Sequence, residues 1–210
     1  MIGLLLALNT ADAAPAHSVA LDVGRMDSSH RGNAMLGYDA LATYGLRMVY
    51  DLERWPALDV TAGLRFSERR TSVMIYDNVS YEDVGQFESR WFHNTAALGL
   101  RLQGHTGWEG FQPYVRGMGS LETGVLRLDE DLDDKENVNR LREVALAPGV
   151  ELVAGVDIVT APFGMDVGPD ISPVLYLETG WNRTGLFDLE EVGEMRFGGF
   201  VIRGGVGVAF

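Results

Sequence analysis

The chain has 210 residues, a length that suits one domain, and it carries a formal net charge of −13. Nucleic acids and anionic membrane surfaces attract basic proteins, so this acidic balance argues against both as partners. The sequence contains no cysteine, which excludes disulfides, cysteine–metal sites and thiol catalysis, and no motif in it indicates a cofactor.

The first residues, MIGLLLALNTADAA, have the pattern of a secretory signal peptide that lacks its basic start. An apolar core at 2–8 precedes Ala11-Asp12-Ala13, a small–any–small sequence of the kind that signal peptidase cuts. We therefore predict that residues 1–14 are the remnant of a truncated signal peptide and that residues 15–210 form a single domain. The alternative is the frayed apolar terminus of a cytosolic protein.

Eight segments of the remaining chain alternate between apolar and polar residues, as strands with two unlike faces do. They span residues 19–24, 42–52, 58–67, 91–102, 113–126, 143–156, 175–181 and 196–210. Pro148, inside the sixth segment, predicts either a β-bulge or a later start of that strand, because proline cannot donate to the sheet.

The connections between these segments alternate in length. Those predicted to be long polar loops span 25–41, 68–90, 127–142 and 182–195. The piece 71–76 is itself prone to form a strand, so that hairpin is expected to extend. The connections at 53–56 and 104–110 are short, whereas the Pro- and Gly-rich stretch 157–173 is an exception. An even strand number with long loops at one end is typical of transmembrane β-barrels.

Charged residues within the segments fall on the face opposite the apolar one. The candidate interior set is Asp22, Arg47, Asp59, Arg65, Arg101, Arg116, Glu122, Glu151, Glu178 and Arg203. A barrel of eight strands has an interior just wide enough to be filled by side chains. If this face points inward, we expect these residues to pair as a network that plugs the barrel, because unpaired buried charge is very costly.

Alternation alone leaves two orientations open. In a soluble, lipocalin-like barrel the apolar face would line a ligand cavity, whereas in a transmembrane barrel it faces lipid. Bulky residues near strand ends suit a membrane interface: Tyr44, Phe66, Trp181 and Phe210. The chain also has a single lysine, Lys135, although water-facing strands usually carry more. We therefore predict an all-β fold, an eight-stranded antiparallel up-and-down transmembrane β-barrel.

The last segment, RFGGFVIRGGVGVAF, resembles the closing strand of bacterial outer-membrane β-barrels. Their assembly signal spaces a polar residue, a glycine, a hydrophobic residue and a terminal aromatic as Arg203, Gly205, Val208 and Phe210 are spaced here, although Val208 stands where the family often has an aromatic. Together with the strand count, this makes the chain similar to barrels of the OmpA-barrel, OmpX and OmpW type.

The resemblance implies a location in the bacterial outer membrane. It also implies contacts with outer-membrane lipid, with lipopolysaccharide and with the barrel assembly machinery. Such barrels serve as structural supports, bind surface ligands through their loops or pass small apolar molecules, and none of these roles involves nucleic acid.

Some barrels of this kind edit the acyl chains of lipid A with a serine, a histidine and a carboxylate. Ser89 and His93 share one strand face, but four residues of strand separate them by roughly 13 Å. A nucleophile and its base must be within hydrogen-bonding distance, so this pair does not fit. Ser28, Ser29 and His30 cluster in a predicted loop without a matching pattern. We predict a non-catalytic barrel, with a lipid A-modifying enzyme as the alternative.

The acidic run at 129–134 spaces carboxylates as calcium ligands are spaced, which makes Asp129, Asp131 and Asp133 candidate metal ligands. An EF-hand loop needs glycine at its sixth position and glutamate at its twelfth, and those positions hold Asp134 and Arg140. The favoured interpretation is a solvated acidic loop.

Overall fold

The computed structural model describes residues 17–28, 38–52, 58–76, 83–104, 106–108, 110–130, 140–160, 171–190 and 193–210. The predicted signal peptide, residues 1–14, lies outside this part, as do Ser29, His30, Asp131 and Asp133. Within the described residues, no helix is long and apolar enough to cross a membrane.

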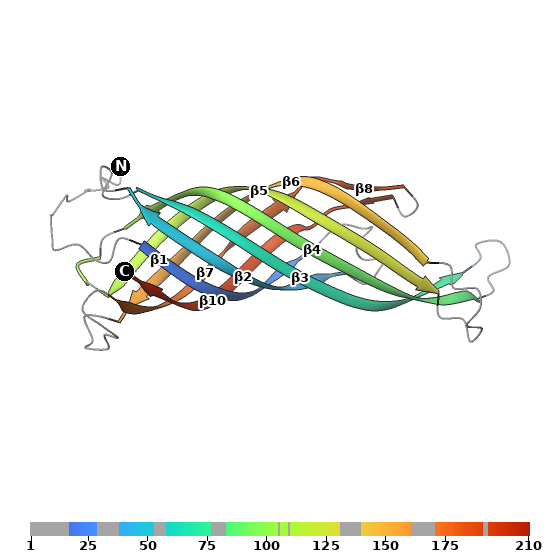
Figure 1. Ribbon diagram of the computed structural model, residues 1–210, viewed down its shortest axis with the longest axis horizontal. Coiled ribbons are helices and arrows are strands. Elements are labelled where there is room, and N and C mark those ends of the chain that lie inside the picture. Colours follow the sequence, from blue (N-terminus) through green and yellow to red (C-terminus); the bar gives the residue numbers. More distant parts are fainter. Residues whose placement is uncertain are drawn as a thin grey trace, which may run out of the picture.

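Eight strands form one closed barrel in the order β1-β10-β7-β6-β5-β4-β3-β2, and all neighbours run antiparallel (Figure 1). Their bounds are β1 His17–Asp27, β2 Ala40–Asp51, β3 Leu58–Tyr76, β4 Asp83–Gln103, β5 Phe111–Glu130, β6 Arg140–Val159, β7 Ser172–Thr184 and β10 Gly198–Ala209. A separate hairpin of β8 (Phe187–Leu189) and β9 (Gly193–Met195) lies between β7 and β10 in sequence. The predicted fold class is confirmed.

The seam between β1 and β10 closes the barrel. The two strands pair from Ser18 opposite Ala209 to Met26 opposite Val201. At the end of the seam, His17 and Phe210 exchange two backbone hydrogen bonds of 3.1 and 2.9 Å. Where all eight strands are paired, closure leaves no sheet edge. Beyond that ring, β3 from Ser67 onward pairs with β4 alone, and the part of β6 before Pro148 pairs with β5 alone.

Many of the described residues predicted to form loops lie in strands. β3 continues through 68–76, which confirms the expected extension of that hairpin at 71–76, and β4 continues through 83–90. β5 and β6 likewise continue through 127–130 and 140–142. Figure 1 shows β3 to β6 reaching beyond the other strands at one end of the barrel. A strand whose outer face extends beyond the apolar surface of the barrel can be as polar in sequence as a loop, so composition does not distinguish the two. In the last predicted loop, β7 extends to Thr184 and β8 and β9 follow.

Pro148 lies within β6, opposite Leu121 of β5, and the register there is continuous. The predicted bulge or later strand start is therefore wrong. The pairing of β6 with β7 ends one residue away, at Gly149 opposite Thr184. Proline is tolerated at such a position because its missing N–H removes no ladder bond from a neighbouring strand.

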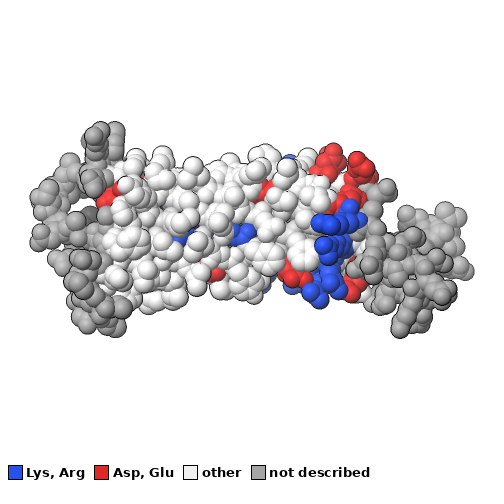
Figure 2. Space-filling view, viewed as in Figure 1, with Lys and Arg blue, Asp and Glu red and all other residues white. Residues whose placement is uncertain are grey.

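The apolar faces of the strands point outward. Leu64, Leu100 and Ile202 are 54%, 51% and 43% exposed, whereas their sequence neighbours Arg65, Arg101 and Arg203 are 6%, 3% and 2% exposed. Figure 2 shows the result as a broad surface almost free of charge, with charged side chains gathered at one edge. The soluble alternative requires the opposite orientation, with apolar residues lining a cavity, and the structure excludes it.

Candidate functional site

The barrel interior is the candidate site, and Glu151 of β6 lies at its centre. Three arginines from three other strands reach this carboxylate: Arg65 of β3 at 3.2 Å, Arg116 of β5 at 3.0 Å and Arg203 of β10 at 2.5 Å. All four side chains are at most 4% exposed. The carboxylate of Glu151 therefore links β6 to three other strands of the barrel.

Glu178 of β7 extends the cluster. Its carboxylate lies 2.6 Å from Arg116 and 3.0 Å from Arg203, and it accepts a hydrogen bond of 3.0 Å from the Tyr114 hydroxyl. Arg116 and Arg203 therefore each contact two carboxylates, which is the kind of pairing that makes buried charge tolerable.

A second centre lies at Asp157 of β6. Its two oxygens accept hydrogen bonds from Arg47 at 2.9 Å and from Arg101 at 2.6 Å. Arg101 also lies 3.4 Å from Asp59. Arg47 donates to the Tyr114 hydroxyl at 2.8 Å, so Tyr114 joins this centre to the one around Glu151 and Glu178.

All ten predicted interior residues are buried, and nine of them lie in this arginine–carboxylate network. Asp22 is at its margin, 3.8 Å from Arg65. Glu122 is the exception, because its carboxylate contacts His93 at 2.6 Å and the Ser120 hydroxyl at 2.8 Å instead of an arginine. The prediction missed Asp157, which it placed in a loop, and the hydroxyl of Tyr114.

Aromatic rings fill the interior beyond the network. Trp91 of β4 stacks on Phe197 at 5.1 Å between centroids and meets Phe187 of β8 edge-on at 5.4 Å. The larger cluster is buried, and its members are Met26, Tyr38, Leu41, Trp91, Leu126, Ala145, Ala147, Phe187, Leu189, Met195, Phe197 and Val201. The interior therefore has two tiers, an ionic one and an apolar one, and the hairpin of β8 and β9 contributes to the apolar tier.

Gly124 makes room for this tier, because a Cβ there would overlap the Trp91 ring, which Phe187 and Phe197 hold in place. We expect Gly124→Val to lower the free energy of unfolding by about 1–3 kcal/mol, as overpacking of a core does. Gly117 is the matched control, since it is exposed on the same strand with open space around it. Urea unfolding in phospholipid vesicles should show the loss for Gly124→Val alone; equal effects would contradict tight packing at Trp91.

The cavities flanking the ionic tier are small. One of about 10 Å³ lies between Arg65, Arg203 and His93, and one of about 60 Å³ lies at the opposite side, near Asp59, Arg101 and Asp157. Ligand pockets measure roughly 300–1,000 Å³. These cavities hold water molecules at most, and the network lies between them.

The two candidate catalytic residues do not form a catalytic pair. The Ser89 hydroxyl is hydrogen-bonded to the hydroxyl of Tyr38, and the His93 ring is hydrogen-bonded to the Glu122 carboxylate. Both side chains are buried, at 0% and 2% exposure. A serine activated by histidine needs a hydrogen bond between the two and a path for the substrate, and the geometry provides neither.

The residues of the predicted assembly signal divide between the two faces of β10. Arg203 belongs to the ionic network, and the backbone at Gly205 packs against the Tyr176 ring, where a Cβ would not fit. Val208 and Phe210 point outward, at 40% and 51% exposure. Among the metal candidates, the side chain of Asp129 also lies outside the described set, and the described residues contain no cluster of three metal-ligating side chains.

No protein-family model and no curated protein matches this chain. Solved structures that match include neisserial surface protein A (NspA), at 14% identity and TM-score 0.48, covering 93% of this chain and 97% of that one. The N-terminal β-barrel domain of Pseudomonas aeruginosa OprF matches at 16% identity and TM-score 0.38, covering 92% and 97%. Ail of Yersinia pestis matches at 11% identity and TM-score 0.42, covering 92% and 94%. Similarity this distant carries no argument about function, and the barrel rests on its own strand pairing.

Proposed function

We propose that this chain is a bacterial outer-membrane β-barrel whose sealed interior neither catalyses nor conducts, and which acts as a structural element or through its surface loops. The observation that carries the proposal is the sidedness of the strands. Apolar side chains cover the outside, and the arginine–carboxylate network lies inside, next to the apolar tier. Water would disfavour such an exterior, and lipid would favour it.

The height of the apolar surface fits a membrane. Along β3, the outward residues from Leu58 to Phe66 are apolar, and Glu68 follows. Eight residues of strand span roughly 27 Å, which at a tilt of about 40° corresponds to about 20 Å across the membrane. The apolar band of known transmembrane barrels is about 25 Å tall, so the two heights are comparable.

The ends of the barrel suggest an orientation. β1 begins and β10 ends at the same end of the barrel, where β2 connects to β3 and β4 to β5 (Figure 1). Transmembrane barrels of bacteria keep their short turns in the periplasm. This end is therefore the periplasmic one, and the regions around 25–41, 68–90, 127–142 and 182–195 face the cell exterior. They are the proposed contact sites for a surface ligand.

A further role belongs to the proposal. Arg203, Gly205, Val208 and Phe210 form the signal that the barrel assembly machinery reads. Outer-membrane lipid and lipopolysaccharide surround the exposed apolar band. No cofactor takes part.

Electrophoresis before and after boiling tests the membrane barrel, because a folded transmembrane barrel keeps a compact form until it is heated. We expect the protein, refolded into phosphatidylcholine vesicles, to migrate differently after boiling and to remain with the vesicles through alkaline washing. Planar bilayers containing the same protein should show no steady open state. A protein that stays in solution without lipid would overturn the membrane assignment, whereas a large, stable conductance would overturn only the sealed interior.

A further inference from the structure

Arginines mark the outer edge of the apolar band. On six strands an outward-facing arginine lies just beyond the last apolar positions of that face: Arg25, Arg70, Arg90, Arg127, Arg142 and Arg183. On β5, for example, Val125 points outward and Arg127 is the next outward residue. Figure 2 shows blue side chains gathered at this edge of the uncharged surface.

Four of these arginines are direct neighbours across the sheet. Arg70 of β3 lies opposite Arg90 of β4, Arg90 lies opposite Arg127 of β5, and Arg127 lies opposite Arg142 of β6. We call these four residues the arginine row. Like charges directly opposite each other destabilise a sheet, so folding alone gives no reason for such a row.

The row is only partly neutralised by the protein. Glu68 lies 2.7 Å from Arg70, and Glu88 lies 2.7 Å from Arg90. The hydrogen bond from Arg90 lowers the pKa of Glu88, which lies beyond the apolar band, so this carboxylate remains ionised. Arg127 lies over the Phe92 ring at 5.5 Å. Among the side chains that the structure describes, neither Arg127 nor Arg142 has a carboxylate partner, and the row keeps a net positive charge.

The opposite edge of the band has no counterpart. The outward positions of the described strands at that end hold no arginine, lysine, aspartate or glutamate: His17, Val19, Tyr50, Leu58, Leu102, Pro113, Ile158, Pro173 and Phe210. A requirement of the fold would affect both edges alike. The asymmetry points to an anionic partner that is present at one membrane interface only.

We propose that the arginine row binds the phosphate groups of a doubly phosphorylated glycolipid in the outer leaflet. This inference rests on the proposed function, because the orientation of the barrel places the row in that leaflet. Guanidinium groups bind phosphate oxygens in pairs of parallel hydrogen bonds. Four strands at a spacing of about 4.8 Å extend the row over roughly 14 Å, enough for two phosphates of one headgroup. Glu68 and Glu88 accept hydrogen bonds from the hydroxyls of the sugar.

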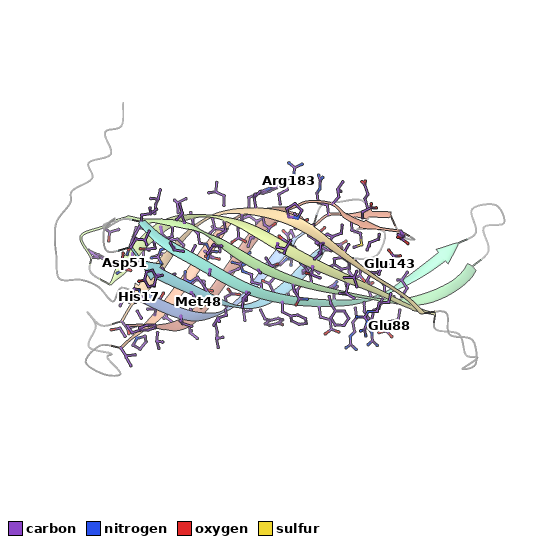
Figure 3. The ribbon with its side chains drawn as sticks, turned by 45° about the horizontal axis from the view of Figure 1, so that its top comes forward. His17, Met48, Asp51, Glu88, Glu143 and Arg183 are labelled. Carbon is purple, nitrogen blue, oxygen red and sulfur yellow. The ribbon has the colours of Figure 1, made fainter. Side chains whose placement is uncertain are left out.

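Titration of fluorescent, doubly phosphorylated lipid A into the folded barrel, in micelles of an uncharged detergent, tests the proposal. The variant carries Arg127→Gln and Arg142→Gln. Each lost arginine removes charge-assisted hydrogen bonds, so binding should weaken by roughly tenfold per arginine. The matched control carries Arg25→Gln and Arg183→Gln, which remove the same charge from the same edge outside the row; Figure 3 shows Arg183 pointing away from the barrel. Its affinity should stay within about twofold of the original.

Competition with two other lipids tests whether the row recognises the phosphates of a glycolipid. Dephosphorylated lipid A should compete poorly, and so should phosphatidylglycerol at equal phosphate concentration. Equal competition by phosphatidylglycerol would overturn the assignment to a glycolipid, and equal losses in the two double variants would overturn the row as the site. The mobility shift on boiling, measured on each variant, keeps the proposed function separate. If that shift is present and the arginine variants bind normally, this inference alone fails; if it is absent in the original protein, both fail.

Discussion

Replacing Glu151 with glutamine should destabilise the barrel more than any other isosteric change of a single side chain in the ionic tier. The substitution removes the charge that faces Arg65, Arg116 and Arg203, and it leaves their guanidinium groups buried with too few anions. Breaking a buried ion pair from one side costs about 3–5 kcal/mol, because the remaining charge is neither paired nor hydrated. Urea unfolding in vesicles, followed by tryptophan fluorescence, measures the loss.

Two comparisons make this result specific. Glu190→Gln removes the same charge from an exposed position and should change stability by less than about 0.5 kcal/mol. The double variant Arg65→Gln with Glu151→Gln removes one cation together with the anion, so it should be more stable than Glu151→Gln alone. A double variant that is less stable by the full sum of both single losses would show that the two residues are not coupled, contrary to the 3.2 Å contact.

The cost in stability of an arginine at the middle of the apolar band should show whether lipid or water surrounds the barrel. Leu98 is 63% exposed and lies opposite Ala62, midway along the outward apolar run of β3. In a bilayer, Leu98→Arg should cost about 2–4 kcal/mol, because the charge must leave the headgroup region. Unfolding in vesicles is again the measurement.

Val144→Arg is the matched control for depth. Val144 is 59% exposed and is the last outward apolar residue on β6 before Arg142. The same substitution there should cost only about 0–1 kcal/mol, as it does near a membrane interface. Similar small costs at both positions would mean that the exterior is hydrated, and they would contradict the membrane barrel.

The class of fold could be predicted from the sequence because apolar and polar residues alternate along the membrane-facing part of every barrel strand. In β10, the predicted outward residues Phe200, Ile202, Val206, Val208 and Phe210 are all exposed, and Val201, Arg203 and Ala209 are buried. The predicted strand ends were less accurate. Once β3 and β4 pass beyond Phe66 and Phe92, their outer faces need not be apolar, and Glu68 or Arg90 there carries no signal for either strand or loop.

The candidate site was only partly predictable for a related reason. Asp157 shares the inward parity of Glu151, so extending the predicted strand 143–156 by one residue would have identified it; the glycine and proline that follow obscured the strand end. Trp91 likewise shares a face with His93, which was the available sign of the apolar tier. Phe187 and Phe197 gave no such sign, because their position depends on how the hairpin of β8 and β9 folds over the barrel, a tertiary contact that periodicity does not encode.

Net charge does not describe how charged residues are distributed over the surface. The value of −13 predicted no affinity for anionic surfaces, but a sum over the whole chain does not record that Arg70, Arg90, Arg127 and Arg142 become neighbours. The strand register determines this arrangement, and it is visible only once the pairing of β3 to β6 is known.

The seam at Ser18 to Met26 has a consequence for how the barrel forms. Its two sides come from opposite ends of the described chain, so the ring cannot be completed by local events. Every other junction joins strands that follow each other closely, apart from the hairpin inserted before β10. Folding rates fall as contacting residues become more distant in sequence, so joining β1 to β10 should be the slow, final step. Until then the incomplete sheet has two open edges, and in lipid no water is present to hydrogen-bond their backbone groups. This favours assembly with a second protein that covers both edges.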